Sequence, residues 1–170
     1  LARVAALYQN VADGAVSASD SASFIISQMK AFGIEAENSI DIINAVNAVS
    51  NNFAVSSTDI SSALTKTSSA MDTLGNDFQS TIGLVTAGTE IMTGQAGKVA
   101  RGLRTIGNNF ASAAQEADSI EYSVEGVTKS LSLLNEETGD IKSTFEIFSD
   151  LKDDWDAMTN SEKQAVAITY

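Results

Sequence analysis

Short helical patterns, each closed by a stop and reopened by a start, are the feature that most constrains how this chain can fold. Residues 51–60 contain both signals. Asn51-Asn52 suits a helix end, because asparagine tolerates the left-handed conformation. A hydroxyl of Ser57 or Thr58 can accept from the free amides of a first turn, and Asp59 complements the positive end of the helix dipole. The segment therefore predicts a packed corner between two helices, not a catalytic or ligand-binding loop.

Apolar residues at helical spacing continue along nearly the whole chain and predict an all-α fold. They indicate a compact multi-helix domain of about seven or eight helices of roughly 10 to 16 residues, joined by short turns. Because the pattern resets at each turn, one long coiled coil is not expected. The stripes lie at Val4, Leu7, Tyr8 and Val11; Ala22, Ile25, Ile26, Met29 and Phe32; Ile42, Val46, Val49 and Phe53; Ile60, Leu64, Thr67, Met71 and Leu74; Phe78, Ile82, Val85, Thr89 and Met92; Val99, Leu103, Ile106 and Phe110; and Phe148, Leu151, Trp155 and Met158.

Glycines and polar caps predict where these helices end and begin. A loop is expected at residues 93–97, and the capping-box spacing of residues 159–162 opens a last helix that continues past Tyr170. The expected stops are Gly14, Gly33 and Gly75, and the expected starts are Ser19 or Asp20 and Asn76 or Asp77.

Residues 111–140 break the helical pattern. Gly126 and Gly139 interrupt it, and we expect an irregular, acidic connecting region with one short helix near Val124 to Leu134, followed by a turn. Aromatic residues are only 6% of the chain, and β-branched residues are not grouped into alternating runs, so no sandwich or barrel is expected. The acidic residues that crowd this region are Glu116, Asp118, Glu121, Glu125, Glu136 and Glu137.

The whole chain, residues 1–170, is expected to be a single helical module excised from a longer polypeptide. Its length suffices for one domain with a core, and its apolar content of 44% is that of a folded protein. The absence of proline permits closely spaced helices. Leu1 stands where an initiator Met would, and a helical pattern still runs at Tyr170, so the chain is expected to continue beyond both ends.

The chain contains neither cysteine nor histidine. This removes disulfides, thiolate chemistry, the usual zinc sites, the Ser/His/Asp triad and the Cys/His dyad. We therefore expect no enzyme activity, no catalytic, cofactor-binding or metal-binding residues, and no cofactor.

The net charge of −12 comes from 22 acidic and 10 basic residues. Binding to nucleic acid requires clustered Lys and Arg that displace counterions, and the only basic cluster is Lys98, Arg101 and Arg104. Direct nucleic-acid binding is therefore not expected. No window approaches the ~18 apolar residues that would span a bilayer, so no membrane span is expected in this segment.

The basic cluster lies beside Gly94, Gly97 and Gly102, which raises the possibility of a phosphate-binding loop. The spacing differs from that of a P-loop, and no strand precedes it. A helix-connecting loop with a basic first turn is the preferred interpretation, and weak anion binding stays open.

The acidic residues of segments 150–156 and 135–140 could suggest a metal site. A calcium loop needs oxygen ligands at alternating positions around a glycine. In the first segment Leu151 and Trp155 occupy helical positions instead, so Asp150, Asp153, Asp154 and Asp156 are expected on the solvated face of a helix. The second segment has turn composition without a complete ligand set.

Hydroxyl and aromatic residues receive structural interpretations as well. Ser61-Ser62 and Ser143-Thr144 have no histidine to activate them, and Lys66 is not at the spacing of a Ser-x-x-Lys motif, so capping and polar-face roles are expected. Phe148 and Trp155, seven residues apart, are expected in the core. Close helix packing is the expected role of the small residues Ala63, Ala70, Gly83, Ala87, Gly88 and Ala100, with a bend as the alternative at the glycines.

Three ordered stretches of the sequence carry a resemblance to known proteins. They are Met29–Ala36; Asn51–Leu64 followed by Ser68–Met71, Gly75–Phe78, Ile82–Gly88 and Val99–Ile106; and Phe145–Ile147 leading to Trp155 and Met158–Ala165. In order and spacing these stretches resemble the phage tail tape measure proteins of the lactococcal-phage type. The resemblance covers most of residues 20–170, and residues 111–140 are the least similar part.

The resemblance implies a structural role in the tail of a phage or prophage. Such proteins are long and helix-rich, lie in several copies within the tail tube, set its length during assembly and leave ahead of the genome. The implied partners are other copies of the chain, the tail-tube protein, tail assembly chaperones and tail-tip proteins. The implied location is the interior of the tube in the virion tail, and the host bacterial cytoplasm during assembly. The many breaks indicate a compact folded module of the ruler, not its shaft.

Two other classes stay open. One is a helical interaction module of a bacterial surface or secreted protein without enzymatic activity. The other is a cell-wall hydrolase fused to the tape measure, for which this segment lacks suitable residues.

Overall fold

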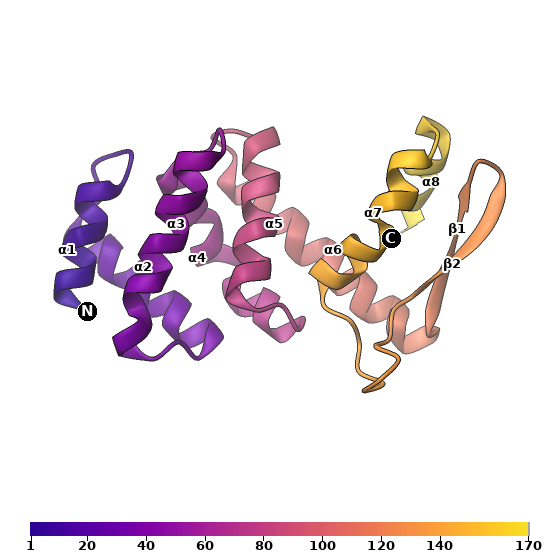
Figure 1. Cartoon of the computed structure of the whole chain (residues 1–170), viewed down its shortest axis with the longest axis horizontal. Helices are drawn as coiled ribbons and strands as arrows, with labels where there is room; N and C mark the ends of the chain where they lie inside the picture. The colour runs from indigo at the N-terminus through magenta and orange to yellow at the C-terminus, as the bar shows by residue number, and fades with distance from the viewer. Residues whose placement is uncertain (170) are drawn as a thin grey trace. The chain divides into compact units, whose positions relative to one another are not determined.

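The computed structural model describes residues 1–169, with side chains through Ala167, and it is predominantly helical (Figure 1). Within this range it contains eight α-helices, one short 3-10 helix and one β-hairpin. The predicted all-α class and number of helices are therefore confirmed. The described chain divides into two compact units, which we call unit 1 (residues 1–73 and 77–104) and unit 2 (residues 74–76 and 105 onward). The single module predicted for residues 1–170 stays a prediction.

Unit 1 is built from helices alone. Helix α2 packs against both α1 and α4, α4 packs against α5, and α3 contacts all four of these helices. The elements are α1 (Ala2–Val11), α2 (Ala18–Phe32), the 3-10 helix η1 (Ala36–Asn38), α3 (Ser39–Asn52), α4 (Ser57–Thr73), α5 (Phe78–Ile91) and the first part of α6 (Ala96–Glu116).

The predicted stripes supply most of the unit 1 core, although several of their members are only partly buried or are exposed. Leu7, Ile26 and Phe53 are more than one third exposed. The helices turn so that Ala5 and Phe24 face inward instead. Phe24 lies between Ser21 and Gln28 on the buried face of α2. Because this face contains polar side chains, a pattern of apolar residues alone does not identify it.

The segment 51–60 forms a corner that is fixed from the loop after α1. The Asp13 N–H donates to Ser57 Oγ and the Ser57 N–H donates to Asp13 Oδ2, both at 2.8 Å. The Tyr8 hydroxyl donates to the Ser57 carbonyl at 3.0 Å. Ser57 is thus occupied by these contacts, and the hydroxyl that caps α4 is that of Ser56, which accepts from the Asp59 N–H.

Helix ends in unit 1 follow the predictions in part. Gly33 ends α2 in the left-handed conformation, with φ of 62°, and Asp77 caps α5. Helix α1, by contrast, ends at Val11, before the predicted stop at Gly14.

The predicted cap of α2 at Ser19 or Asp20 is wrong. Ser17 Oγ accepts from the Asp20 N–H, and the helix begins at Ala18.

Unit 2 joins the end of α6 to a hairpin and two helices. The hairpin strands are β1 (Ser119–Val124) and β2 (Val127–Ser132), followed by α7 (Thr144–Ala157) and α8 (Asn160–Thr169). The strands pair antiparallel, with Ile120 opposite Leu131. The unit 2 cluster is Phe110, Ile120, Tyr122, Val124, Leu131, Leu133, Ile147, Leu151 and Met158, all of them buried.

The short helix predicted near Val124 to Leu134 is wrong, because this part of the chain forms the hairpin. Ile120, Tyr122 and Val124 are buried, whereas the residues between them are less buried, which is the two-residue period of a strand. Glu125 and Gly126 form the two-residue turn with φ of 51° and 80°, the conformation that a tight hairpin requires. Segment 111–140, expected to be irregular, contains the end of α6 and this hairpin.

The last two helices begin with capping boxes. Ser143 and Glu146 form one at α7, and Thr159 and Glu162 exchange the same pair of bonds at α8, as predicted. The predicted continuation past Tyr170 lies outside the described residues.

Candidate functional site

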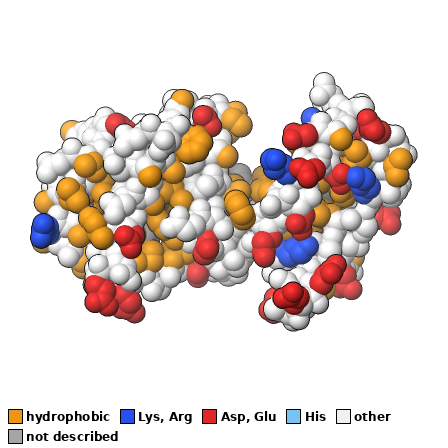
Figure 2. Space-filling model, viewed as in Figure 1, with side chains coloured by type: hydrophobic (Ala, Val, Ile, Leu, Met, Phe, Trp, Pro, Cys, Tyr) orange, Lys and Arg blue, Asp and Glu red, His pale blue; other side chains and the backbone are white. Residues whose placement is uncertain are grey.

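Two groups of the predicted basic loop at the start of α6 are engaged in contacts within unit 1. Arg104 donates to the Lys66 carbonyl at 2.8 Å, which joins α6 to α4. The Gly94 N–H donates to Asp59 Oδ2 at 3.1 Å, so a carboxylate occupies the amide that an anion would need. Carboxylates are numerous on the face shown in Figure 2, and Lys and Arg are sparse. The loop therefore serves to connect α5 to α6.

The aspartates of α7 take part in separate ion pairs. Asp154 accepts from Lys129 and from the Tyr122 hydroxyl, and Asp150 accepts from Lys142 at 2.7 Å. Burial raises the pKa of Tyr122 to about 12, and the Lys129 hydrogen bond lowers the pKa of Asp154. Among the residues that the structure describes, no group of three acidic side chains is placed to hold a metal ion.

The serine pairs have structural roles. Ser143 Oγ caps α7, and Thr144 is buried beside Gly107. Lys66 Nζ donates to Ser62 Oγ at 3.2 Å across one exposed helical turn, the ordinary spacing of such pairs.

The aromatic and small residues lie largely where they were predicted. Phe148 packs edge-on against Phe110, with ring centroids 5.8 Å apart, and Trp155 lies against the unit 2 cluster. A side chain at Gly88 would come within 2.6 Å of Val99, so this glycine allows α5 and α6 to approach closely. Gly83 has open space around it, so close packing does not explain that position.

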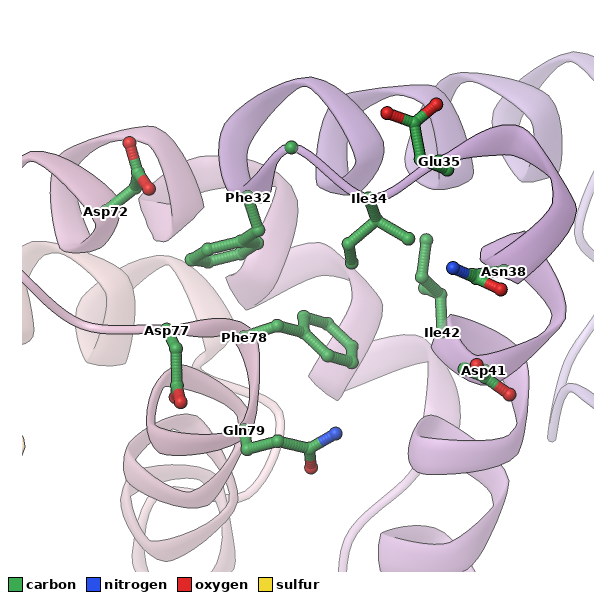
Figure 3. A pocket seen from close by; sticks show the side chains of 11 residues that line it. Phe32, Ile34, Glu35, Asn38, Asp41, Ile42, Asp72, Asp77, Phe78 and Gln79 are labelled. Atoms are coloured by element: carbon green, nitrogen blue, oxygen red, sulfur yellow. The ribbon is translucent and has the colours of Figure 1, made fainter.

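A pocket of about 470 Å³ in unit 1 is the candidate binding site. Figure 3 shows its apolar side chains gathered at the centre and its carboxylates around them. The residues come from the end of α2, the following loop, the start of α3, the last turn of α4 and the start of α5. They are Phe32, Gly33, Ile34, Glu35, Asn38, Asp41, Ile42, Asp72, Asp77, Phe78 and Gln79.

The floor of this pocket is apolar and partly open. The rings of Phe32 and Phe78 meet edge to face with centroids 5.7 Å apart. Ile42 and Phe78 are buried, whereas Phe32 and Ile34 are half-buried. Gly33 makes this floor possible, because its left-handed conformation ends α2 and lets the Ile34 N–H donate back to the Met29 carbonyl at 3.0 Å.

The rim of the pocket is acidic. Glu35, Asp41, Asp72 and Asp77 line it, and no lining residue is basic. Asp77 caps α5, and the backbone N–H of Ser80 holds the pKa of its carboxyl below the usual range. Asp72 lies in the last turn of α4, where the helix dipole disfavours a negative charge.

The sequence interpretation did not identify this pocket. It predicts Phe32 and Ile42 as members of core stripes and Gly33 as a helix stop. It does not predict that α3 and α5 lie close to each other. A usable signal was present at Ile34 and Asp72. The first is an apolar residue directly after a helix stop, and the second is an acid at the unfavourable end of a helix.

These features define a predominantly helical protein with a surface pocket. A sequence model of the phage-related minor tail protein family matches residues 2–169. The chain belongs to this family, which indicates a structural role in the virion tail and association with other tail proteins. No solved structure matches the chain. Within the described range, no helix is both long and apolar enough to cross a bilayer.

Proposed function

We propose that this chain is part of a tape measure protein, the tail component that sets tube length during assembly and is released during genome ejection. Membership of the phage-related minor tail protein family over residues 2–169 is the observation that carries the proposal. The ordered resemblance of residues 20–170 to tape measure proteins narrows the role within that family.

The helical architecture bears on which part of this role the segment would perform. A continuous helix extends ~1.5 Å per residue, which is the physical basis of a molecular ruler. The helices here are short and folded back, with 21 residues in the longest, α6. We therefore assign to this segment a folded module that docks partners, and assign the measuring length to other parts of the parent protein.

The partners proposed for the module are other copies of the chain, the tail-tube protein, assembly chaperones and tail-tip proteins. Its proposed location is the tube interior in the virion, and the host cytoplasm during assembly. The alternative of a bacterial surface module has no support comparable to the family match.

The proposal is tested by changing the length of the parent gene and measuring tails in electron micrographs. Duplicating a helical stretch of about 100 residues outside this module should lengthen the tail by about 150 Å. Deleting the 170 residues of the module should shorten it by less than the roughly 250 Å of an equally long straight helix. Tails of unchanged length after the duplication would refute the ruler role.

A further inference from the structure

We propose that the acidic-rimmed pocket of unit 1 binds a short polypeptide segment in which Lys or Arg residues flank an apolar side chain. The inference concerns the surface of this chain and does not depend on the tape measure role. It begins from the apolar floor, which folding alone leaves incompletely covered. Phe32 and Ile34 keep part of their surface exposed at the centre of the pocket, whereas Ile42 and Phe78 are buried (Figure 3).

The size of the pocket sets the scale of the occupant. Its volume of about 470 Å³ lies within the ~300–1,000 Å³ that is usual for pockets that bind small ligands or side chains. This space suits one or two side chains of an extended or helical segment. An apolar side chain in contact with Phe32 and Ile34 would remove their exposed surface from water.

The charge of the rim selects the flanking residues of the occupant. Four of the eleven lining residues are acidic and none is basic. Across the described part of the chain, no ion pair joins Glu35, Asp41 or Asp72 to a Lys or Arg. This differs from Asp150 and Asp154 of α7, which both have lysine partners.

Helix termini account for only part of this acidic rim. Asp41 lies in the first turn of α3 and Asp77 caps α5, and both complement the positive end of a helix dipole. Asp72 gains nothing of this kind, because it lies near the C-terminus of α4. A Lys or Arg of a partner would place a positive charge beside the Asp72 carboxylate, next to the apolar floor of the pocket.

The test uses the full 170-residue chain and a probe peptide, acetyl-Gly-Arg-Leu-Arg-Gly-amide, followed by amide chemical shifts. The expected result is saturable shifts at Phe32, Ile34 and Ile42. A peptide with Glu in place of Arg should not bind. A peptide with Ser in place of Leu, and spermine as a cation without an apolar side chain, should bind at least fivefold more weakly.

Two matched double variants distinguish binding at the pocket from a general attraction of the cationic peptide to the acidic chain. Asp41→Asn with Asp72→Asn should weaken the probe about fivefold, as expected for two exposed charge pairs. Asp153→Asn with Asp156→Asn changes the net charge equally on exposed positions of α7 and should leave binding unchanged. Both variants are first checked for native helicity by circular dichroism.

Three results would overturn the proposal. They are no shifts at the pocket residues at millimolar peptide, equal binding of spermine and the probe, and equal weakening by the two double variants.

Discussion

The two units bury different kinds of side chain, although they belong to one chain. Unit 2 encloses a cluster of aliphatic and aromatic side chains, and the polar side chains that it buries among the described residues are Asn76, Ser143 and Thr144. Unit 1 also buries Ile and Leu, but its helix interfaces contain many buried polar side chains. These are Ser21, Gln28, Ser39, Ser57, Thr67, Ser68, Thr81, Thr86 and Thr89.

The difference follows from how helices and hairpins satisfy polar groups. A buried Thr on a helix can donate to the carbonyl four residues earlier, as Thr86 does to Ile82 at 2.7 Å and Thr89 does to Val85 at 2.8 Å. A two-stranded hairpin is barely stable by itself and must bury a large apolar face against helices. Unit 1 can therefore tolerate polar interfaces, whereas unit 2 depends on a few large apolar side chains.

The largest expected effect is the loss of one of those apolar side chains. Ile147 is fully buried in the unit 2 cluster, and Ile147→Ala should lower the free energy of unfolding by about 2–5 kcal/mol. Urea denaturation followed by the fluorescence of Trp155, the only tryptophan of the chain, measures this free energy of unfolding for unit 2. Phe145→Ala on the same helix, at a position 42% exposed, should change stability by less than about 0.5 kcal/mol.

The same experiment addresses the predicted single module. Circular dichroism reports mainly on the helices of unit 1, and Trp155 reports on unit 2. Coincident transitions in the unchanged chain would support one cooperative module over residues 1–170. Separate transitions would contradict it.

The comparison also explains which parts of the fold could be predicted from the sequence. Helix stops and caps act within one turn, so Gly33, Asp77 and Thr159 were identified from local residues. The hairpin was missed because its signal, Ile120 to Val124, is only a few residues long and lies in an acidic stretch that has turn composition. Its stability comes from α7 and α8, which lie far along the sequence.

The candidate pocket could not be predicted for a related reason. Several lining residues have ordinary local roles: Gly33 is a stop, Asp77 is a cap, and Phe32, Ile42 and Phe78 belong to core stripes. The pocket exists because α2, α3, α4 and α5 end or begin near one another, and single-sequence periodicity does not encode that arrangement. The absence of catalytic residue types, by contrast, follows directly from composition.

A buried polar pair tests whether unit 1 depends on its hydrogen bonds. Ser68 Oγ donates to Gln28 Oε1 at 2.6 Å between α2 and α4. Gln28→Leu keeps most of the volume but leaves Ser68 unpaired, and should lower stability by about 1–3 kcal/mol. Adding Ser68→Ala should recover most of that loss in a double-mutant cycle followed by circular dichroism. An additive double variant would show that the pair is not coupled.

An unsatisfied hydroxyl in the same unit predicts an effect of the opposite sign. Thr67 Oγ1 is buried in α4 and has no hydrogen-bond partner among the residues that the structure describes. Thr67→Val should raise the free energy of unfolding by about 1 kcal/mol, because it removes a polar group that is desolvated without compensation. Thr65→Val is the matched control, since Thr65 is exposed and already donates to the Ser61 carbonyl. A loss of stability in Thr67→Val would indicate that the hydroxyl has a partner in solution.

The turn of the hairpin offers a smaller gain in unit 2. Glu125 has φ of 51°, which disfavours most side chains other than Asn and Asp. Glu125→Asn gives the Asn-Gly pair that favours this turn, and should stabilise unit 2 by about 0.5 kcal/mol in the Trp155 assay. Glu125→Ala, which keeps the strain, should give no such gain. Equal stability of the two variants would show that the turn conformation is not limiting.

The smallest expected effect is a pH dependence at the contact between the hairpin and α8. The Gly126 N–H donates to the Glu162 carboxylate at 2.9 Å, and the Thr159 N–H donates to its other oxygen. These bonds lower the pKa of Glu162 from 4.5 to about 2. Because the folded pKa is depressed, the stabilisation is complete above pH 4.5 and is lost as the pH falls toward 2. The Gly126 amide shift in a pH titration should follow a midpoint near 2, and Glu162→Gln should abolish that transition. A midpoint near 4.5 would show that the carboxylate does not hold the hairpin turn, and that the unit 2 cluster alone fixes the hairpin on the helices.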